Sequence, residues 1–312
     1  MTKDVASSDL KQLYVPAISS HKGQNGRLLI IGGSHLFHAA SLWALQVASK
    51  IVDLVHYSSV AENNALVHEL KKEFRNGIVV PRLEIEAYIE EDDVILIGPG
   101  MVRTSARLEQ KIQKLKDIEK LNDEGLQTQA LTNYLVTKYP HKQWVIDAGA
   151  LQMIDVDLIP TNSILTPHLG ELERLWEKDD ELIRLAGNQE IAVADKAALF
   201  AKRHKCIVLV KGETDVAVNG GECDERICLP GETRQIKGGN AGMTKGGTGD
   251  VLAGLVAALA TKNDPFLSTI CGSYINKKAG ESLFKRVGLY FNASDLADEI
   301  PKVMKEALVG SL

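Results

Sequence analysis

The stretch Gly238-Gly-Asn-Ala-Gly-Met-Thr-Lys-Gly-Gly-Thr-Gly-Asp250 leads directly into the apolar segment Val251-Leu-Ala-Gly-Leu-Val-Ala-Ala-Leu-Ala260. Six of the first thirteen residues are glycine, and the apolar segment has the length and composition of a buried helix. Glycine lets the backbone turn its N–H groups toward a ligand, and a helix start adds unpaired donors and a partial positive charge. The stretch therefore predicts an anion-binding loop at a helix N-terminus.

Asp250 is unusual beside such a loop, because a carboxylate repels a bound phosphate unless it accepts a proton or faces a metal. An acidic residue also stabilises the first turn of a helix, and a single Gly-Asp pair usually has only that role. The glycines just before Asp250 favour the interpretation that it is a catalytic base, which takes a proton from a substrate.

The chain has 312 residues, of which 45% are hydrophobic and 25% are charged, as in an ordinary globular protein. This length exceeds the usual size of one domain, but α/β folds often reach it as a single unit. No internal repeat or proline-rich linker divides the sequence, so we expect one domain over 1–312. The net charge of −5 argues against nucleic acid as the main partner.

No apolar run approaches the length of a membrane span, and the polar residues 1–9 lack the apolar core of a secretory signal. We therefore expect a cytoplasmic protein with no membrane partner. The cysteines Cys206, Cys223, Cys228 and Cys271 lack the paired short spacings of zinc ligands. Cys223 and Cys228 could meet across a hairpin, but reduced thiols are expected in the cytoplasm.

Short apolar segments alternate with helical segments along the chain. Segments 27–34 and 53–58 have the composition of buried strands on either side of a helix over 39–52, which is a βαβ unit. Further strands are expected to begin near 93, 144, 163 and 206, and helices over 188–204, 264–286 and 293–309, the last capped by Ser294 or Asp295. Asn219-Gly-Gly221 indicates a hairpin between 215–218 and 226–229. The alternation predicts a parallel sheet with helical crossovers.

Ligands of an open parallel sheet bind beyond the carboxyl ends of its strands. Several residues follow such ends and are candidates for a pocket: Gly98, Gly100, Asp147, His168, Glu171 and Lys211. Each also has a plainer interpretation. The glycines could form a simple turn, His168 could be buried and hydrogen-bonded, Glu171 could only stabilise a first helical turn, and Lys211 could lie on the surface.

Other features carry weaker signals. His35 and His38 have a spacing that could hold a metal, but no Cys, Asp or Glu lies near them in the sequence, so we interpret them as lining a pocket mouth. Gly32-Gly-Ser34 lacks the spaced glycines of the dinucleotide-binding fingerprint. The charged segment 104–142 predicts an exposed helix or helix pair, to which we assign no chemistry.

An ordered set of motifs runs from about residue 23 to the C-terminus: Gly32-Gly-Ser34, Gly98-Pro-Gly100, Asp147-Ala-Gly-Ala-Leu151, Thr166-Pro-His-Leu-Gly-Glu171, Lys211-Gly212 and Gly239-Asn-Ala-Gly-Met-Thr-Lys-Gly-Gly-Thr-Gly-Asp250. The set resembles the NAD(P)H-hydrate dehydratase family, the carbohydrate-kinase-like part of the nicotinamide nucleotide repair system. The resemblance implies a ribokinase-like α/β fold, with a central, mostly parallel β-sheet and helices on both faces. The epimerase domain fused to some members is not expected, because residues 1–22 are too short to form it.

The resemblance also implies a reaction. The enzyme would phosphorylate the hydroxyl of the hydrated cofactor NADHX or NADPHX, and loss of phosphate would restore NADH or NADPH. ADP is the expected phosphoryl donor, giving AMP and phosphate, with ATP as the alternative, and Mg²⁺ is the expected cofactor. A separate NAD(P)HX epimerase is the expected partner in the pathway, and a homo-oligomer, commonly a tetramer in the family, is the expected assembly.

Residue roles follow from the resemblance position by position. The catalytic base would be Asp250, and the anion hole would be formed by Gly246, Gly247, Thr248 and Gly249. The NAD(P)HX site would comprise Ala40, Gly100, His168 and Asp250. The nucleotide site would comprise Lys211, Gly212, Glu213, Thr214, Asp215 and Gly249, and Glu171 would hold magnesium.

The chain departs from the family pattern at several of its motifs. Phe37 and Ala39 stand where the family has Tyr and Gly, and Leu169 and Ala241 replace prolines. In the Lys-Gly-x-x-Thr motif, Thr214 comes one place early and Asp215 occupies its position.

Two other functions use the same features. A small-molecule kinase of the hydroxyethylthiazole or hydroxymethylpyrimidine type would use the same Asp250 and loop but release a stable phosphate ester. A non-catalytic nucleotide-binding regulator would need only the fold. The presence of Asp250, Glu171 and the loop glycines favours an enzyme.

Overall fold

The computed structural model describes residues 3–4, 7–108, 110–187, 190–221 and 231–308. Within them, ten strands form a single sheet. Its order from one edge to the other is β1 (Lys3–Asp4), β10 (Thr233–Ile236), β9 (Asp215–Asn219), β8 (Ile207–Val210), β7 (Ile164–Leu165), β6 (Gln143–Ile146), β5 (Val94–Ile97), β2 (Arg27–Ile31), β3 (Leu54–Ser58) and β4 (Ile78–Val79).

All neighbouring strands from β4 across to β8 are parallel, as the alternation of strands and helices predicted. β9 is antiparallel to both β8 and β10, so the sheet is mixed at this end. The turn at Asn219 does leave β9, but the predicted second strand over 226–229 lies outside the described residues, as do Cys223 and Cys228. Cys206 and Cys271 are buried free thiols.

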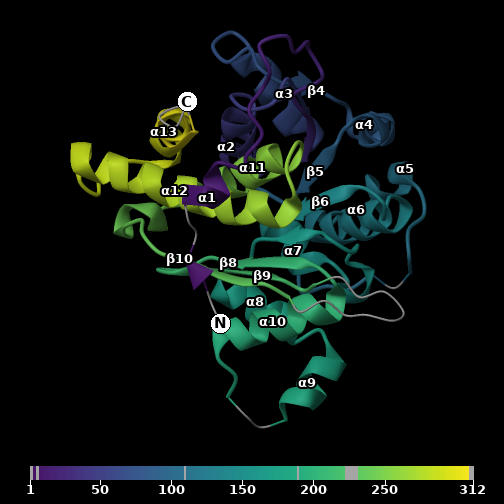
Figure 1. Ribbon diagram of the computed structural model, residues 1–312. Helices are drawn as coiled ribbons and strands as arrows, with labels where there is room; N and C mark the ends of the chain where they lie inside the picture. Colours follow the sequence, from purple (N-terminus) through teal and green to yellow (C-terminus); the bar gives the residue numbers. More distant parts are fainter. Residues whose placement is uncertain (1–2, 5–6, 109, 188–189, 222–230, 309–312) are drawn as a thin grey trace.

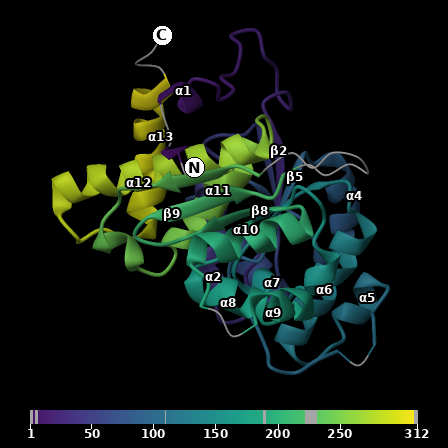
Figure 2. The same ribbon diagram turned by 60° about the horizontal axis from the view of Figure 1, so that its bottom comes forward.

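Helices cover both faces of the sheet (Figures 1 and 2). One core contains α2 (His38–Ala48), α11 (Thr248–Ala260), α12 (Pro265–Val287) and α13 (Ala293–Leu308). The other contains α4 (Ile85–Glu91), α6 (Glu124–Lys138), α7 (Ala148–Met153), α8 (Leu169–Trp176) and α10 (Val193–His204). The shorter helices are α1 (Ser7–Leu10), α3 (Ala61–Leu70), α5 (Leu115–Ile118), α9 (Asp180–Ala186), η1 (Arg82–Glu84), η2 (Val156–Leu158) and η3 (Ala241–Thr244).

The strands supply both cores because side chains alternate between the faces of a sheet. In β2, Leu28 and Ile30 enter the first core, whereas Leu29 and Ile31 enter the second, and all four are fully buried. A strand that is apolar at every position is therefore required, and the continuous apolar runs in the sequence meet that requirement.

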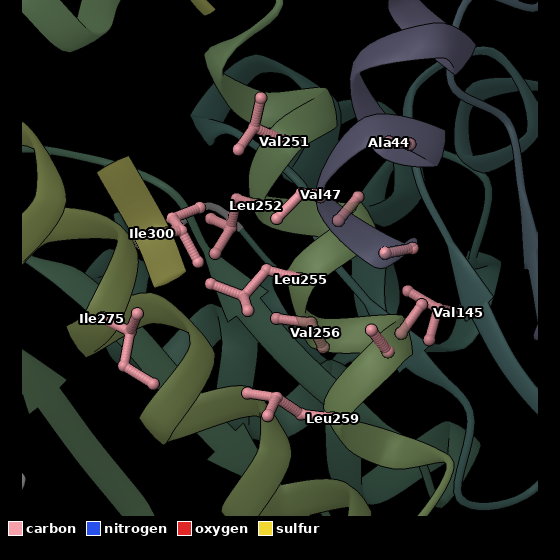
Figure 3. Packing of buried hydrophobic residues seen from close by; sticks show 14 of the residues in the cluster. Ala44, Val47, Val145, Val251, Leu252, Leu255, Val256, Leu259, Ile275 and Ile300 are labelled. Carbon is pink, nitrogen blue, oxygen red and sulfur yellow. The ribbon is translucent and has the colours of Figure 1, made fainter. Parts of the chain in front are cut away.

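Helix α11 lies at the centre of the first core, between α2, α12 and the sheet (Figure 3). Every residue from Val251 to Ala260 is buried, which explains why this helix has no polar face. Gly254 permits the close approach of α2, because a Cβ there would lie 2.7 Å from the Cα atom and the carbonyl oxygen of Ala44. This packing fixes the N-terminus of α11, and with it Asp250, relative to the sheet.

Three sequence expectations need correction. The helix after β2 ends at Ala48, and residues 49–52 form a turn instead of its last turn. Segment 104–142 does contain two helices, α5 and α6, but α6 buries one side, including Leu131 and Leu135, in the second core. Helix α13 is capped by Asn292, whose side chain accepts a hydrogen bond from the Asp295 N–H group.

Among the described residues, no helix is both long enough and apolar enough to cross a membrane.

Candidate functional site

The predicted pocket residues meet at the carboxyl edge of the parallel strands. Asp147 follows β6, and His168 and Lys211 follow β7 and β8, where their backbones form one further parallel bridge. Gly98 is held against the Asp147 backbone, because a Cβ on Gly98 would lie 1.8 Å from the Asp147 carbonyl oxygen. Residues that are distant in the sequence thus lie together because each follows the carboxyl end of a parallel strand.

The glycine-rich loop reaches this edge through η3 and then α11. Gly247 has a φ of +95°, and a Cβ there would lie 2.3 Å from the ring of Trp43, so only glycine fits. The Thr248 hydroxyl contacts the carbonyl oxygens of Met243 (2.6 Å) and Lys245 (2.9 Å), which ties the loop to the helix start.

The loop leaves backbone donors available for an anion. The N–H groups of Gly246, Gly247 and Gly249 have no acceptor among the described residues, and that of Thr248 makes only a long bond of 3.4 Å to Lys245. These are the four residues of the predicted anion hole, and they stand at the positive end of a thirteen-residue helix.

Four charged groups cluster beside the loop. Lys211 Nζ lies 2.8 Å from Asp147 Oδ1 and 4.0 Å from Glu171 Oε2, and Asp250 adds a third carboxyl group. The side chain of Lys211 is only 19% exposed, so the alternative of a surface lysine is wrong. Thr166 donates a hydrogen bond of 2.8 Å to Asp147 and so helps to hold that carboxylate in place.

The excess of carboxyl groups has a consequence for Asp250. Burial, followed by repulsion from the Asp147 carboxylate, raises the pKa of Asp250 to about 7, although Lys211 works in the opposite direction. A carboxyl group with this pKa can release and accept a proton near neutral pH, which is the property a general base requires.

His168 and Glu171 form a reciprocal cap at the start of α8. The Glu171 N–H group donates to His168 Nδ1 (3.3 Å), and the His168 N–H group donates to Glu171 Oε2 (2.9 Å). Because Nδ1 accepts, the neutral imidazole carries its proton on Nε2. The His168 side chain is 56% exposed, so the alternative of a buried histidine is wrong.

Glu171 itself is buried, as expected for a residue in a first helical turn that also faces the charged cluster. Gln152 of α7 donates a hydrogen bond of 3.0 Å to Glu171 Oε1. Gln152 in turn accepts from Arg103 and from Arg174. Residues that the sequence did not single out therefore fix the orientation of this carboxylate, and no local motif marks them.

A cavity of about 940 Å³ opens between the glycine loop and the turn after β8. It is lined by His168, Lys211, Gly212, Glu213, Thr214, Asp215, Lys237, Gly238, Gly239, Asn240, Ala241, Met243, Thr244, Thr248, Gly249, Leu252, Asn276 and Lys277. All six residues predicted for the nucleotide site are in this set.

Asp215 differs from the others, because its buried carboxylate is already used within the protein. It accepts hydrogen bonds from the Gly212 N–H group (2.9 Å) and the Ser273 hydroxyl (2.7 Å), and Lys277 Nζ lies 3.2 Å away. Lys277 also donates to the carbonyl oxygens of Gly212 and Glu213. Asp215 thus shapes the turn that was predicted to bind the nucleotide, and Lys277 was missed because charged residues surround it in a long helix.

Ala40 and Gly100 are in contact with each other but line no part of this cavity. A Cβ on Gly100 would lie 3.0 Å from Ala40 Cβ and 3.2 Å from Gly33 Cα, so the two glycine turns and the start of α2 are in contact. His168 lines the large cavity, whereas Ala40 and Gly100 do not. Asp250 lies in the first turn of α11, the helix that packs against α2.

His35 and His38 do not form a metal site. His35 pairs with Glu124, and His38 Nδ1 lies 3.1 Å from the side-chain oxygen of Asn63. Within the described residues, no group of three or more His, Cys, Asp or Glu side chains could hold a metal ion. Glu171, a single buried carboxylate facing the cavity edge, fits a Mg²⁺ ion that keeps several waters and binds phosphate oxygens.

The fold and this arrangement of loop, lysine and carboxyl groups place the chain among ribokinase-like α/β proteins. A ribokinase-like superfamily protein of Enterococcus faecalis covers 98% of the chain with a TM-score of 0.72 at 22% identity, and the chain covers 96% of that structure. The ADP/ATP-dependent NAD(P)H-hydrate dehydratase of Bacillus subtilis, co-crystallised with ATP and Mg²⁺, covers 98% with a TM-score of 0.71 at 19% identity, and 99% of it is covered.

Sequence comparison identifies the family. The family model for NAD(P)H-hydrate dehydratase matches residues 28–302, and the chain belongs to this family. It is 33% identical over 311 residues to the bifunctional NAD(P)H-hydrate repair enzyme of Methanocaldococcus jannaschii, across 96% of this chain but only 52% of that protein. It is 29% identical to the ADP-dependent (S)-NAD(P)H-hydrate dehydratase of Nitrosopumilus maritimus, with 98% of both chains covered. The chain thus spans about half of the bifunctional relative.

Proposed function

We propose that this protein is an ADP-dependent (S)-NAD(P)H-hydrate dehydratase. It would transfer a phosphoryl group from ADP to the hydroxyl group of NADHX or NADPHX, and elimination of phosphate would regenerate NADH or NADPH. The observation that carries the proposal is Asp250, a carboxyl group with a pKa raised to about 7 in the first turn of a helix that follows a glycine loop.

Each part of the site has a place in this reaction. Asp250 takes the proton of the attacking hydroxyl, because an alcohol is a weak nucleophile until that proton is removed. The N–H groups of Gly246, Gly247, Thr248 and Gly249 stabilise the charge on the transferred phosphoryl oxygens. The products of this first step are AMP and a phosphate ester of the hydrated ring.

The second step needs no further phosphoryl transfer. Phosphate leaves the ring together with a proton from the neighbouring carbon, so that the ring double bond forms again. The same backbone donors stabilise the departing phosphate. The products of the whole reaction are NADH or NADPH, AMP and inorganic phosphate.

The large cavity would hold ADP, with its phosphates toward Lys211 and the glycine loop. Lys211 supplies a positive charge that attracts phosphate, and the residues of the turn Gly212–Asp215 line the same cavity. Glu171 would hold Mg²⁺, which when bound neutralises part of the phosphate charge. His168, with a proton on Nε2, can donate a hydrogen bond to the hydrated ring near Ala40 and Gly100.

The choice of ADP over ATP is supported by relatives that the chain matches along their full length. The proteins of Nitrosopumilus maritimus and Xanthomonas campestris, both named as ADP-dependent, are covered to 98% and 96% at 29% identity each. We further propose that this chain works with a separate NAD(P)HX epimerase, which supplies the (S) form of the substrate. We also propose a homo-oligomer, a tetramer, as the assembly.

A direct test follows NADH absorbance. Purified protein is incubated with (S)-NADHX, Mg²⁺ and either ADP or ATP, and NADH, AMP and phosphate are quantified together. The proposal expects NADH to return with ADP at a higher kcat/KM than with ATP. Return with ATP alone would overturn the ADP assignment. Absence of NADH with both donors, or accumulation of a stable phosphate ester, would overturn the dehydratase assignment and leave the kinase alternative.

A further inference from the structure

A second cavity, of about 720 Å³, lies at the same carboxyl edge of the sheet, but beyond β2, β3 and β5. Its walls include His35 from the turn after β2, Val60 from the segment after β3, and Val102 and Arg103 from the segment after Gly100. The proposed nucleotide cavity lies at the other end of this edge, beside β8 and β9. Asp250 directly follows Gly249, which lines the nucleotide cavity, and Gly100 lies two residues before Val102, which lines the second cavity.

Arg82, in η1 after β4, lines this second cavity and is 7% exposed. Its Nε and Nη2 atoms are buried and have no hydrogen-bond acceptor among the described residues. Burial lowers the pKa of the guanidinium, and Glu119, Tyr57 and Glu124 offset only part of that effect. A buried guanidinium without acceptors is energetically costly, so acceptors from outside the protein chain would stabilise Arg82.

The acidic side chains in the same cavity are accounted for in other ways. Glu124 accepts hydrogen bonds from the backbone and the ring of His35, and Asp123 caps α6 by accepting from the Leu126 N–H group. Glu62 and Glu119 also line the cavity, but both residues are exposed to solvent. No cluster of three or more potential metal ligands occurs in the part of the chain that the structure describes, so the cavity does not have the composition of a cation site.

The size of the substrate explains why a second cavity is needed. NADHX and NADPHX are dinucleotides, and only their hydrated ring has to reach Asp250. ADP would fill the cavity on the β8 side, so the remainder of the dinucleotide has to leave the ring site in another direction. The segment from Gly100 to Arg103 runs from the ring site directly into the second cavity.

We propose that the second cavity binds the remainder of the dinucleotide substrate and that Arg82 binds its diphosphate. A planar guanidinium suits two phosphate oxygens, and Arg82 lines the cavity while its Nε and Nη2 atoms have no acceptor within the described residues. This proposal rests on the proposed function and adds a residue that determines which substrates are accepted. A nicotinamide compound without phosphate would gain nothing from Arg82.

The test compares three hydrated substrates in steady-state assays with ADP: NADHX, NADPHX and hydrated reduced nicotinamide riboside, which has the ring and ribose but no phosphate. The variants are Arg82→Gln and Arg82→Lys, and the matched control is Arg75→Gln, an exposed arginine in the turn after α3. The riboside reports whether each variant is folded and catalytically intact. Turnover of NADHX by the unaltered protein establishes the proposed function separately.

Arg82→Gln is expected to lower kcat/KM for NADHX and NADPHX alike, by roughly tenfold to a hundredfold, because a charge-assisted contact is lost. The rate with the riboside and the KM for ADP should stay within about twofold. Arg82→Lys should recover only part of the loss, because lysine cannot form the paired contact. Equal losses with all three substrates would overturn the proposal in favour of a structural role, and a loss confined to NADPHX would reassign Arg82 to its extra phosphate.

Discussion

Two lysine–aspartate pairs border the large cavity, and they differ in how their charges are satisfied. Lys277 contacts Asp215 and three carbonyl oxygens, and Asp215 also accepts hydrogen bonds from Gly212 and Ser273, so one cation meets one anion. Lys211 contacts Asp147 but also faces Glu171 and Asp250, so one cation meets three carboxyl groups.

This difference separates a structural pair from a chemical one. In the first pair every polar group has a partner, and one positive charge balances one negative charge. In the second cluster one carboxyl group must bind a proton readily, and Asp250 is the one whose pKa is raised to about 7. An excess of negative charge, together with burial, gives a carboxyl group a pKa that suits proton transfer near neutral pH.

The largest expected effect is that of Asp250→Asn. The amide keeps the shape of the side chain but cannot accept the proton, so kcat should fall by about 100-fold to 10,000-fold. The Kd for ADP, measured by calorimetry, should change by no more than about threefold, because the backbone N–H groups proposed to bind its phosphates are unchanged. A suitable control is Asp295→Asn in the first turn of α13, and turnover near normal in Asp250→Asn would assign the base to another residue.

The structural pair is tested by Lys277→Met. Removing the lysine leaves the Asp215 carboxylate buried without its cation, so the free energy of unfolding should fall by about 3–5 kcal/mol in urea titrations. Lys278→Met is the matched control, since Lys278 is the next residue and forms only a partly exposed pair with Glu281. It should change stability by less than about 1 kcal/mol. Equal effects of the two substitutions would contradict the distinction between the two clusters.

Much of this site could be predicted from the sequence because it depends on local rules. The glycines before Asp250, the apolar run after it and the polar residues at strand ends are each visible in a short stretch of sequence. Helix α6 shows why the prediction of an exposed segment was wrong. Its polar residues are plain in the sequence, but the burial of Leu131 and Leu135 depends on the neighbouring sheet.

The residues that were missed act across the fold. Lys277 reaches Asp215 over 62 positions in the sequence, and Gln152 reaches Glu171 from a different helix. Arg82 belongs to a short 3₁₀ turn after a two-residue strand, which has no periodic pattern. The role of such a residue follows from the group that it contacts in the folded chain, and that contact is not visible in the sequence.

The pKa of Asp250 predicts two opposite pH dependences. The value of kcat/KM, which reports on the free enzyme, should rise as the pH increases through about 7, because only the ionised Asp250 carboxylate can act as the base. Stability should change in the other direction. Between about pH 4 and pH 7 the unfolded chain has lost the Asp250 proton and the folded chain keeps it, so unfolding becomes easier as the pH rises.

Asp250→Asn isolates this effect, because it removes the titrating group. Relative to Asp250→Asn, the unaltered protein should lose roughly 2–4 kcal/mol of unfolding free energy between pH 4 and pH 8. Urea titrations at both pH values measure it. If the difference in unfolding free energy between the two proteins is the same at both pH values, Asp250 has an ordinary pKa in the folded state. The neighbouring carboxyl groups then do not raise that pKa.

The smallest expected effect concerns the orientation of Glu171. Gln152→Leu removes the hydrogen bond to Glu171 Oε1, while the His168 N–H group still holds Oε2. The carboxylate then loses one of two restraints, so the Mg²⁺ concentration at half-maximal rate should rise by about threefold to tenfold. The maximal rate at saturating Mg²⁺ should recover, because Gln152 contacts neither Asp250 nor the loop. Gln143→Leu, which breaks a bond to the Asn162 carbonyl at the start of β6, at the other end of that strand from Asp147, is the control. A lower maximal rate with no change in Mg²⁺ dependence would place Gln152 in the packing of α7 and remove the main support for Glu171 as the magnesium ligand.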